Sequence, residues 1–174
     1  MLPFRSNTKF FLILFLSRKS IILSEGARLT IRHETALSAD DFTALADFVY
    51  AEGDIAARVA SGSYRTDGMV VVPCSMKTLS AIASAYDENL IVRAADVCLK
   101  ERRPLVLVPR EMPLRSAHLR NMLTCSEDGA VIIPPTLSFY MGECGMTRQL
   151  DQITGKILSQ PGLSHEGFAV WQGV

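Results

Sequence analysis

The stretch VVVPCSMKTL, at positions 70–79, decides the fold. Its valines form a β-branched run that stops at Pro73, and Ser75 then precedes a pattern typical of a helix. This order predicts a buried strand whose carboxyl end leads directly into a helix N-terminus. Such an end attracts anions, because free backbone N–H groups and the helix dipole point towards it. An ordinary strand–helix turn, with Ser75 as its capping residue, explains these residues equally well.

The bulk composition excludes several classes of protein. The 174 residues are 48% hydrophobic and carry no net charge, which predicts one domain with a substantial core. Without a basic stripe, nucleic acid is not expected as the main partner. The cysteines, Cys74, Cys98, Cys125 and Cys144, are widely spaced and form no C-x-x-C pair. This spacing argues against a zinc site and favours reduced thiols in a cytoplasmic protein.

The N-terminus holds a continuous apolar run, Phe10–Leu16. The run is too short to span a bilayer as a helix, and Arg18 and Lys19 follow it where a signal peptide has a small-residue cleavage site. We interpret it as a buried strand or a substitute for one; a disordered leader and a targeting segment are the alternatives. We therefore divide the chain into a divergent segment, 1–21, and one domain, 22–174, and expect no membrane partner.

Along the rest of the chain, apolar runs alternate with helical patterns. The expected strands are 20–23, 68–73, 104–109 and 130–133, and the expected helices are 27–32, 42–48, 54–60, 75–85, 89–101, 116–126 and 150–158. Because the strands are continuous apolar runs, they predict an α/β fold with a parallel sheet covered by helices on both faces. Ligands in such sheets bind at the carboxyl ends of the strands.

Polar side chains follow the last three of these expected strands. Residues 75–78 follow the first of them, Arg110 and Glu111 the second, and residues 136–140 the third. All would lie at one edge of the sheet, where basic side chains suit a phosphate, and a carboxylate and an aromatic hydroxyl suit a reacting organic group. Taken singly, Arg110–Glu111 is typical of a surface ion pair and Tyr140 of a half-buried loop anchor. The agreement of three strand ends favours a binding site.

Several longer motifs are specific. They are PCSMKTL from position 73, NL…RAADV…LKERR over 89–103, VPREMPL over 108–114, HLRNM over 118–122, GAVIIPP over 129–135, FY at 139–140 and WQG at 171–173. Through them the chain, from about Ile22 to its end, resembles the UbiX-type flavin prenyltransferases, a family that includes proteins formerly called phenylacrylic acid decarboxylases. The resemblance implies a Rossmann-like, or flavodoxin-like, three-layer fold.

The resemblance also implies an activity. Members of this family transfer a dimethylallyl group from dimethylallyl phosphate to reduced FMN, and they need no metal. The resemblance therefore implies FMN as the cofactor and prenylated FMN as the product. It further implies a UbiD-type decarboxylase as the recipient of that product, and a homo-oligomer built from trimers, up to a dodecamer.

Matching the family motifs residue by residue assigns the site. The expected FMN contacts are Ser24, Ser75, Met76, Lys77, Thr78 and Arg110. The expected contacts of the prenyl phosphate are Tyr140 and Lys156, together with Arg93 and Lys100 from a neighbouring subunit and Trp171 near the prenyl group. Glu34 and Glu111 match the active-site carboxylates, which would manage protons on the flavin.

Two departures from the family pattern stand out. The family begins with a strand, a Gly-Ala-Ser-Gly loop and a helix, which this chain does not have. Phe10–Leu16 cannot replace that strand in parallel with 20–23, because a parallel crossover needs a dozen or more residues. Lys156 stands where the family usually has an arginine, and lysine keeps the charge but loses the bidentate fork.

These departures define the alternative function. It is a catalytically impaired relative that binds FMN or only assembles. Direct decarboxylation is disfavoured, because no residue offers an electron sink without a modified cofactor.

Overall fold

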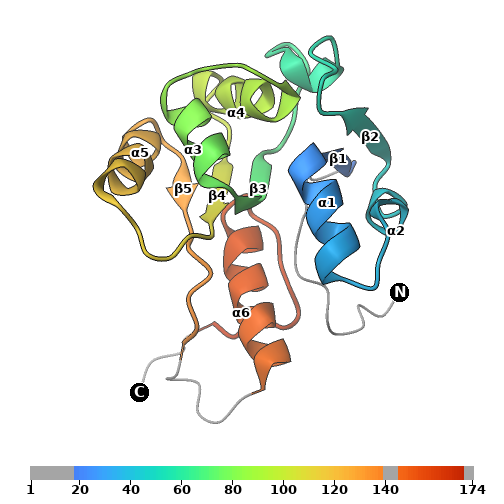
Figure 1. Cartoon of the computed structure of the whole chain (residues 1–174), viewed down its shortest axis with the longest axis vertical. Coiled ribbons are helices and arrows are strands. Elements are labelled where there is room, and N and C mark those ends of the chain that lie inside the picture. Colours follow the sequence, from blue (N-terminus) through green and yellow to red (C-terminus); the bar gives the residue numbers. More distant parts are fainter. Residues whose placement is uncertain (1–17, 139–144, 171–174) are drawn as a thin grey trace.

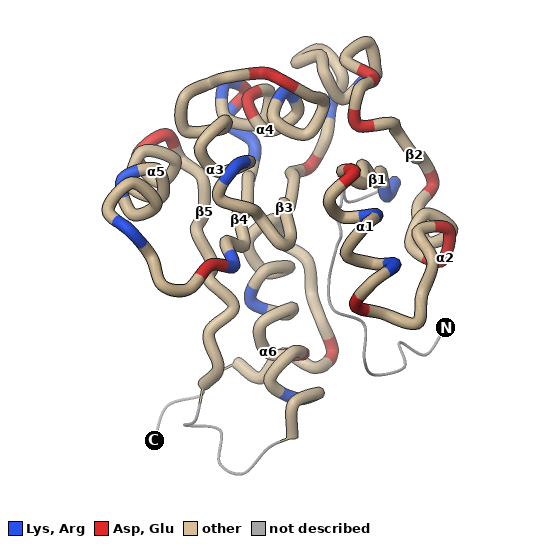
Figure 2. Tube along the Cα trace, in the orientation of Figure 1, with Lys and Arg blue, Asp and Glu red and all other residues tan. Residues whose placement is uncertain are grey.

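The computed structural model describes residues 18–138 and 145–170. In chain order the elements are β1 (Ser20–Leu23), α1 (Glu25–Glu34), α2 (Ala39–Thr43), β2 (Phe48–Ala51), the 3-10 helix η1 (Arg58–Ala60), β3 (Met69–Cys74), α3 (Met76–Ala83), α4 (Leu90–Lys100), β4 (Leu105–Pro109), α5 (Ser116–Glu127), β5 (Val131–Ile132) and α6 (Met146–Ser159) (Figure 1). Basic and acidic residues are interspersed along these elements (Figure 2).

The strands of the described residues fall into two parallel sheets. In the larger sheet, β4 lies between β3 and β5, and Val106 is opposite both Val70 and Val131. In the smaller sheet β1 pairs with β2, and Ile22 is opposite Tyr50. Parallel neighbouring strands need long crossover connections. In the larger sheet, α3 and α4 connect β3 to β4, and α5 connects β4 to β5. The predicted α/β class with parallel strands is confirmed.

Helices cover both faces of the larger sheet (Figure 1). On one face, Val71 and Leu107 join the main core, to which α3, α4 and α5 contribute. On the other face, Ile157 of α6 packs with Val70 and Val106. Successive strand residues therefore point into different core layers, as the two-residue period of a strand requires. The predicted three-layer arrangement is confirmed.

The smaller sheet carries α1 and α2 and has a core of its own. Ile21, Leu23, Ile31 and Phe42 form this core, whereas Ile22 points into the main core. Among the described residues, β1 pairs only with β2 and β3 pairs only with β4, so neither has a partner on its second edge. The expected lack of the family's first strand stays a prediction, because residues 1–17 lie outside the described part.

The expected helix over 42–48 is wrong, and the one or two helical turns expected over 54–60 are present in part. The pattern over 42–48 predicted one helix, but α2 ends at Thr43 and Phe48 begins β2, a strand that we did not expect. β2 alternates between half-buried and exposed residues, so it lacks the continuous apolar run that marks the other strands. Over 54–60 the structure has one helical turn, η1. Among the remaining expected elements, the strand 20–23 is present with the expected ends. The others are present with shifted ends, the largest shift being at the start of α6.

Candidate functional site

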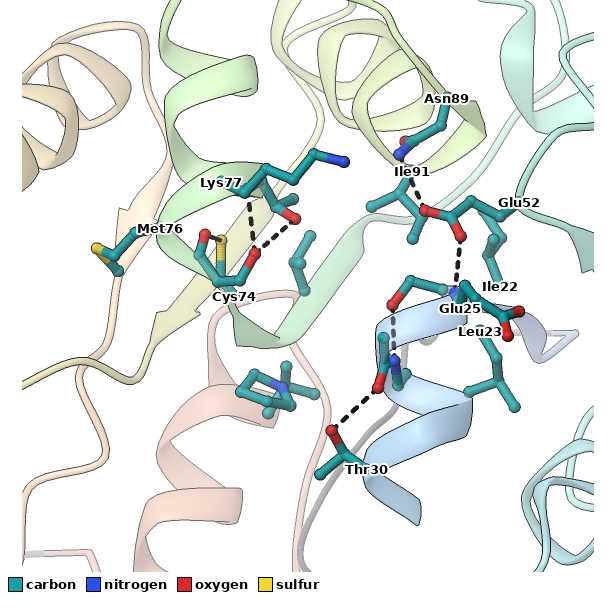
Figure 3. Close-up of a pocket in the computed structure, with 18 of the residues that line it drawn as sticks. Ile22, Leu23, Glu25, Thr30, Glu52, Cys74, Met76, Lys77, Asn89 and Ile91 are labelled. Atoms are coloured by element: carbon teal, nitrogen blue, oxygen red, sulfur yellow. Dashed lines mark hydrogen bonds between the residues drawn. The ribbon is translucent and has the colours of Figure 1, made fainter. Parts of the chain in front are cut away.

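A cavity of about 580 Å³ lies between β1 and β3, and most of its wall is drawn in Figure 3. Its walls come from the ends of β1 and β3, the N-termini of α1, α3 and α4, and the residues that follow β4. Small-molecule sites typically enclose about 300–1,000 Å³, so the size suits an organic ligand. The cavity therefore lies at the edge where the sequence predicts a ligand.

Ser75 shapes the wall formed by α3. Its Oγ accepts a hydrogen bond from the backbone N–H of Thr78 at 3.2 Å and lies 3.1 Å from the Thr78 hydroxyl. The backbone N–H of Leu79 makes the first bond within the helix, to the Ser75 carbonyl. The N–H groups of Met76 and Lys77 precede that bond, so they have no acceptor within the helix. Ser75 is thus both a helix cap and a wall residue.

Ser24 is likewise the cap of α1 and a wall residue of the cavity. Its Oγ accepts from the backbone N–H of Ala27 at 3.0 Å, and the helix then runs away from the cavity (Figure 3). The positive ends of two helices, α1 and α3, consequently meet at one cavity. Both favour a negatively charged group there.

Two basic side chains add to this preference for a negatively charged group. Lys77 and Arg110 line the cavity, and the Lys77 Nζ lies 3.0 Å from Oε1 of Glu88. The hydrogen bond with Glu88 raises the pKa of Lys77, which therefore stays charged at neutral pH. An anion that binds Lys77 has to compete with Glu88. Glu111 also lines the cavity, and its carboxylate accepts from the backbone N–H of Met112 at 3.1 Å.

Glu52 is a wall residue that the sequence analysis missed. One carboxylate oxygen accepts from the backbone N–H of Glu25 at 2.8 Å, and the other accepts from the Asn89 side-chain amide at 3.0 Å (Figure 3). The Glu52 carbonyl accepts from the N–H of Leu90 at 2.9 Å. Glu52 therefore joins the N-terminus of α1 to that of α4. A single acidic residue in a turn gives no sequence signal for such a role.

Cys74 lines the cavity but is not a nucleophile. Its side chain is fully buried, and burial raises the pKa of the thiol to about 12, with a smaller contribution from Cys125. The thiol stays neutral at physiological pH, and a neutral thiol is a poor nucleophile. Within residues 18–138 and 145–170, no three His, Cys, Asp or Glu side chains form a group that could hold a metal ion.

The structure brings most of the predicted FMN and acid–base residues together. Those at the cavity wall are Ser24, Ser75, Met76, Lys77, Thr78, Arg110 and Glu111. Glu34 is not among the wall residues; it is exposed at the carboxyl end of α1. The catalytic role of Glu34 stays a prediction.

Of the predicted prenyl-phosphate residues, the three that the structure describes, Arg93, Lys100 and Lys156, are not among the wall residues. Arg93 contacts Asp87 at 2.8 Å and the Ala60 carbonyl at 3.2 Å, and Lys100 ends α4. Lys156 is exposed on α6, and Tyr140 and Trp171 lie outside the described residues. Their roles, including the reach of Arg93 and Lys100 into a neighbouring subunit, stay predictions.

Sequence comparisons find close relatives. The family model named Flavoprotein matches residues 7–160. A probable UbiX-like flavin prenyltransferase from Sedimentibacter hydroxybenzoicus is 56% identical over 153 residues, which cover 88% of this chain and 81% of the relative. The flavin prenyltransferase UbiX from Methanothermobacter thermautotrophicus is 45% identical over 156 residues, which cover 90% of this chain and 82% of that protein.

Solved structures similar to this chain also include UbiX-type proteins. AnUbiX in complex with FMN and dimethylallyl pyrophosphate superposes with a TM-score of 0.86 at 48% identity, over 89% of this chain and 82% of that one. A dodecameric FMN-dependent UbiX-like decarboxylase from Escherichia coli O157:H7 superposes with a TM-score of 0.85 at 47% identity, over 90% of this chain and 84% of that one. The flavodoxin-like fold expected from the resemblance is confirmed. This chain therefore belongs to the flavoprotein family and, within it, to the UbiX-like flavin prenyltransferases.

Proposed function

We propose that this protein transfers the dimethylallyl group of dimethylallyl phosphate to reduced FMN. One observation carries the proposal: the N-termini of α1, α3 and α4, two basic side chains and several hydroxyls line one cavity between β1 and β3. The related AnUbiX structure, at 48% identity, is a complex with FMN and dimethylallyl pyrophosphate.

The residues present fit FMN. Its phosphate suits the positive ends of α1 and α3, and Ser24, Ser75 and Thr78 provide hydroxyl groups for the phosphate or the ribityl chain. Lys77 and Arg110 add positive charge at the same wall. When bound and reduced, FMN supplies the nucleophilic ring atoms N5 and C6.

The chain's own residues would stabilise the departing phosphate, hold the prenyl group and transfer protons. Transfer breaks the carbon–oxygen bond of the prenyl phosphate, so negative charge grows on the departing phosphate. Lys156 and Tyr140, with Arg93 and Lys100 of a neighbouring subunit, would stabilise that charge. Trp171 would lie against the prenyl group. Glu111 and Glu34 would take up and return protons as the new bonds form.

The proposal includes partners. The dodecameric relative supports a homo-oligomer, which we infer is built from trimers so that Arg93 and Lys100 can reach a second site. A UbiD-type decarboxylase is the proposed recipient of the product, and the cytoplasm is the proposed compartment. In the described part of the chain, no helix has the length and apolar character needed to cross a membrane.

An anaerobic assay tests the proposal. Reduced FMN and dimethylallyl phosphate are mixed with the protein, prenylated flavin is detected by mass, and FMN binding is followed separately by fluorescence quenching. We expect product from the wild type. Glu111→Gln should bind FMN normally and turn over more slowly, whereas the exposed Glu127→Gln should match the wild type.

The outcomes separate the two candidate functions. FMN binding without product would favour the alternative of an impaired FMN-binding relative. Within residues 18–138 and 145–170, β1 pairs only with β2 and β3 pairs only with β4, and this observation favours that alternative. A protein that binds no FMN would overturn both the activity and the assignment of the cavity.

A further inference from the structure

One ion pair joins the starts of two helices at the wall of the cavity. Lys77, in the first turn of α3, places its Nζ 3.0 Å from Oε1 of Glu88, which lies one position before Asn89, the cap of α4. Figure 3 shows the Lys77 side chain extending from α3 towards Asn89. Both partners of the ion pair line the cavity. The charge that Lys77 offers to an anion is therefore already balanced by a carboxylate of the protein.

The two partners differ in how firmly they are held. The backbone N–H of Glu88 donates to the Tyr86 carbonyl at 2.8 Å, and the side-chain amide of the next residue, Asn89, makes hydrogen bonds through both its nitrogen and its oxygen. The Lys77 side chain is 75% exposed, whereas that of Glu88 is 25% exposed. Lysine also carries its charge on a flexible four-carbon chain. Lys77 is therefore the partner that moves when an anion enters, and the Glu88 carboxylate stays in place.

Glu88 differs from other acidic residues of the wall in what its carboxylate contacts. The Glu52 carboxylate accepts from the N–H of Glu25 and from the Asn89 side chain. The Glu111 carboxylate accepts from the backbone N–H of the residue that follows it. Among the ion pairs between described residues, only that of Glu88 includes a basic residue of the wall. Glu88 is consequently the acid that competes directly with an anionic ligand.

We propose that Glu88 is an internal counterion of Lys77 and that it weakens the binding of a flavin through its phosphate group. The inference rests on the proposed function, in which the flavin is FMN. A phosphate that binds Lys77 has to displace the Glu88 carboxylate, and it then lies near a second negative charge. Riboflavin has the same ring and ribityl chain but no phosphate, so it does not meet this competition. Glu88 therefore reduces the preference of the cavity for FMN over riboflavin.

Glu88→Gln tests this competition, because it removes the charge and keeps the size of the side chain. The dissociation constants of FMN and of riboflavin are measured separately, by quenching of flavin fluorescence at low ionic strength. We expect the dissociation constant of FMN to fall by about 2-fold to 5-fold, the effect typical of an exposed ion pair when salt does not screen it. The dissociation constant of riboflavin should change by less than about 1.5-fold, since riboflavin carries no phosphate.

Two controls isolate the ion pair from other effects. Glu127→Gln makes the same change of net charge at an exposed position of α5 outside the cavity wall, so it should leave both dissociation constants unchanged. Lys77→Met removes the basic partner, so adding Glu88→Gln to it should lower the dissociation constant of FMN by a smaller factor than in the wild type. Unchanged riboflavin binding in Glu88→Gln shows that the cavity keeps its structure.

The failures can be told apart. If Glu88→Gln leaves the dissociation constant of FMN unchanged or raises it, or tightens riboflavin binding by the same factor, the competition is overturned and the proposed function stays intact. An equal tightening of FMN binding in the Lys77→Met background overturns the role of Glu88 as the counterion of Lys77. A wild type that binds no FMN overturns the proposed function, and the inference with it.

Discussion

Replacing Glu52 by alanine should weaken the link between the two sheets. The substitution removes the contacts of the carboxylate with the Glu25 N–H at 2.8 Å and the Asn89 amide at 3.0 Å. A hydrogen bond to a charged group contributes about 1.5–3 kcal/mol, and exposure of the Glu25 contact places it near or below the lower end of this range. We therefore expect the free energy of unfolding to fall by about 2–3 kcal/mol.

Urea unfolding measures this change. The midpoint and the slope together give the free energy of unfolding for each variant. Asp54→Ala is the matched control, because it removes an exposed carboxylate from the same turn and should cost less than about 0.5 kcal/mol. Glu52→Gln should fall between the two, because one of its two terminal atoms becomes an amide nitrogen that cannot accept a hydrogen bond.

FMN affinity gives a second readout of the same change. Glu25 and Asn89 both line the cavity, so the loss of Glu52 should also weaken FMN binding. If Glu52→Ala unfolds like Asp54→Ala and binds FMN like the wild type, water replaces the carboxylate at no cost. The reasoning from these two contacts would then be refuted.

Three further changes have expected outcomes. Ser75→Ala removes the cap of α3, so it should cost about 1 kcal/mol in urea unfolding and weaken FMN quenching; unchanged values in both would contradict its double role. Lys156→Arg restores a bidentate fork and should lower KM for dimethylallyl phosphate; an equal KM would contradict a phosphate contact. Burial raises the pKa of Cys74 to about 12, and of Cys98 and Cys125 to about 11, from 9.0, which favours the neutral thiols of the folded state. Stability should therefore be constant below about pH 9 and fall as the pH rises towards 11–12, and urea unfolding at about pH 8 and pH 10 checks this.

The larger sheet could be predicted because its strands are buried on both faces. β3 and β4 read as unbroken apolar runs, and Ser75 and Asn89 mark the starts of the helices that follow. β2 could not be predicted in this way. It has only one neighbour among the described strands and exposes every second residue, so its short alternating pattern did not distinguish it from the end of a helix.

The cavity wall could be predicted where topology alone determines it. Residues directly after parallel strands meet at one edge, which brings Ser75 and Arg110 together without any knowledge of side-chain contacts. Glu52 could not be found, because its side chain contacts residues far along the chain, Glu25 and Asn89. An isolated polar residue has no period or motif that would point to such a partner.

The division of the strands into two sheets has a consequence for how the molecule opens. The smaller sheet has a core of only a few buried side chains, so we expect the amides of β1 and β2 to exchange with solvent through a partial opening, at a lower free energy than those of β3 and β4. The contacts of Glu52 would break in that first step. A ligand that touches both Ser24 and Ser75 binds only the closed form, so it should raise the free energy of the partial opening towards that of complete unfolding. Cofactor loading would then convert a molecule that opens in two steps into one that unfolds as a single cooperative unit.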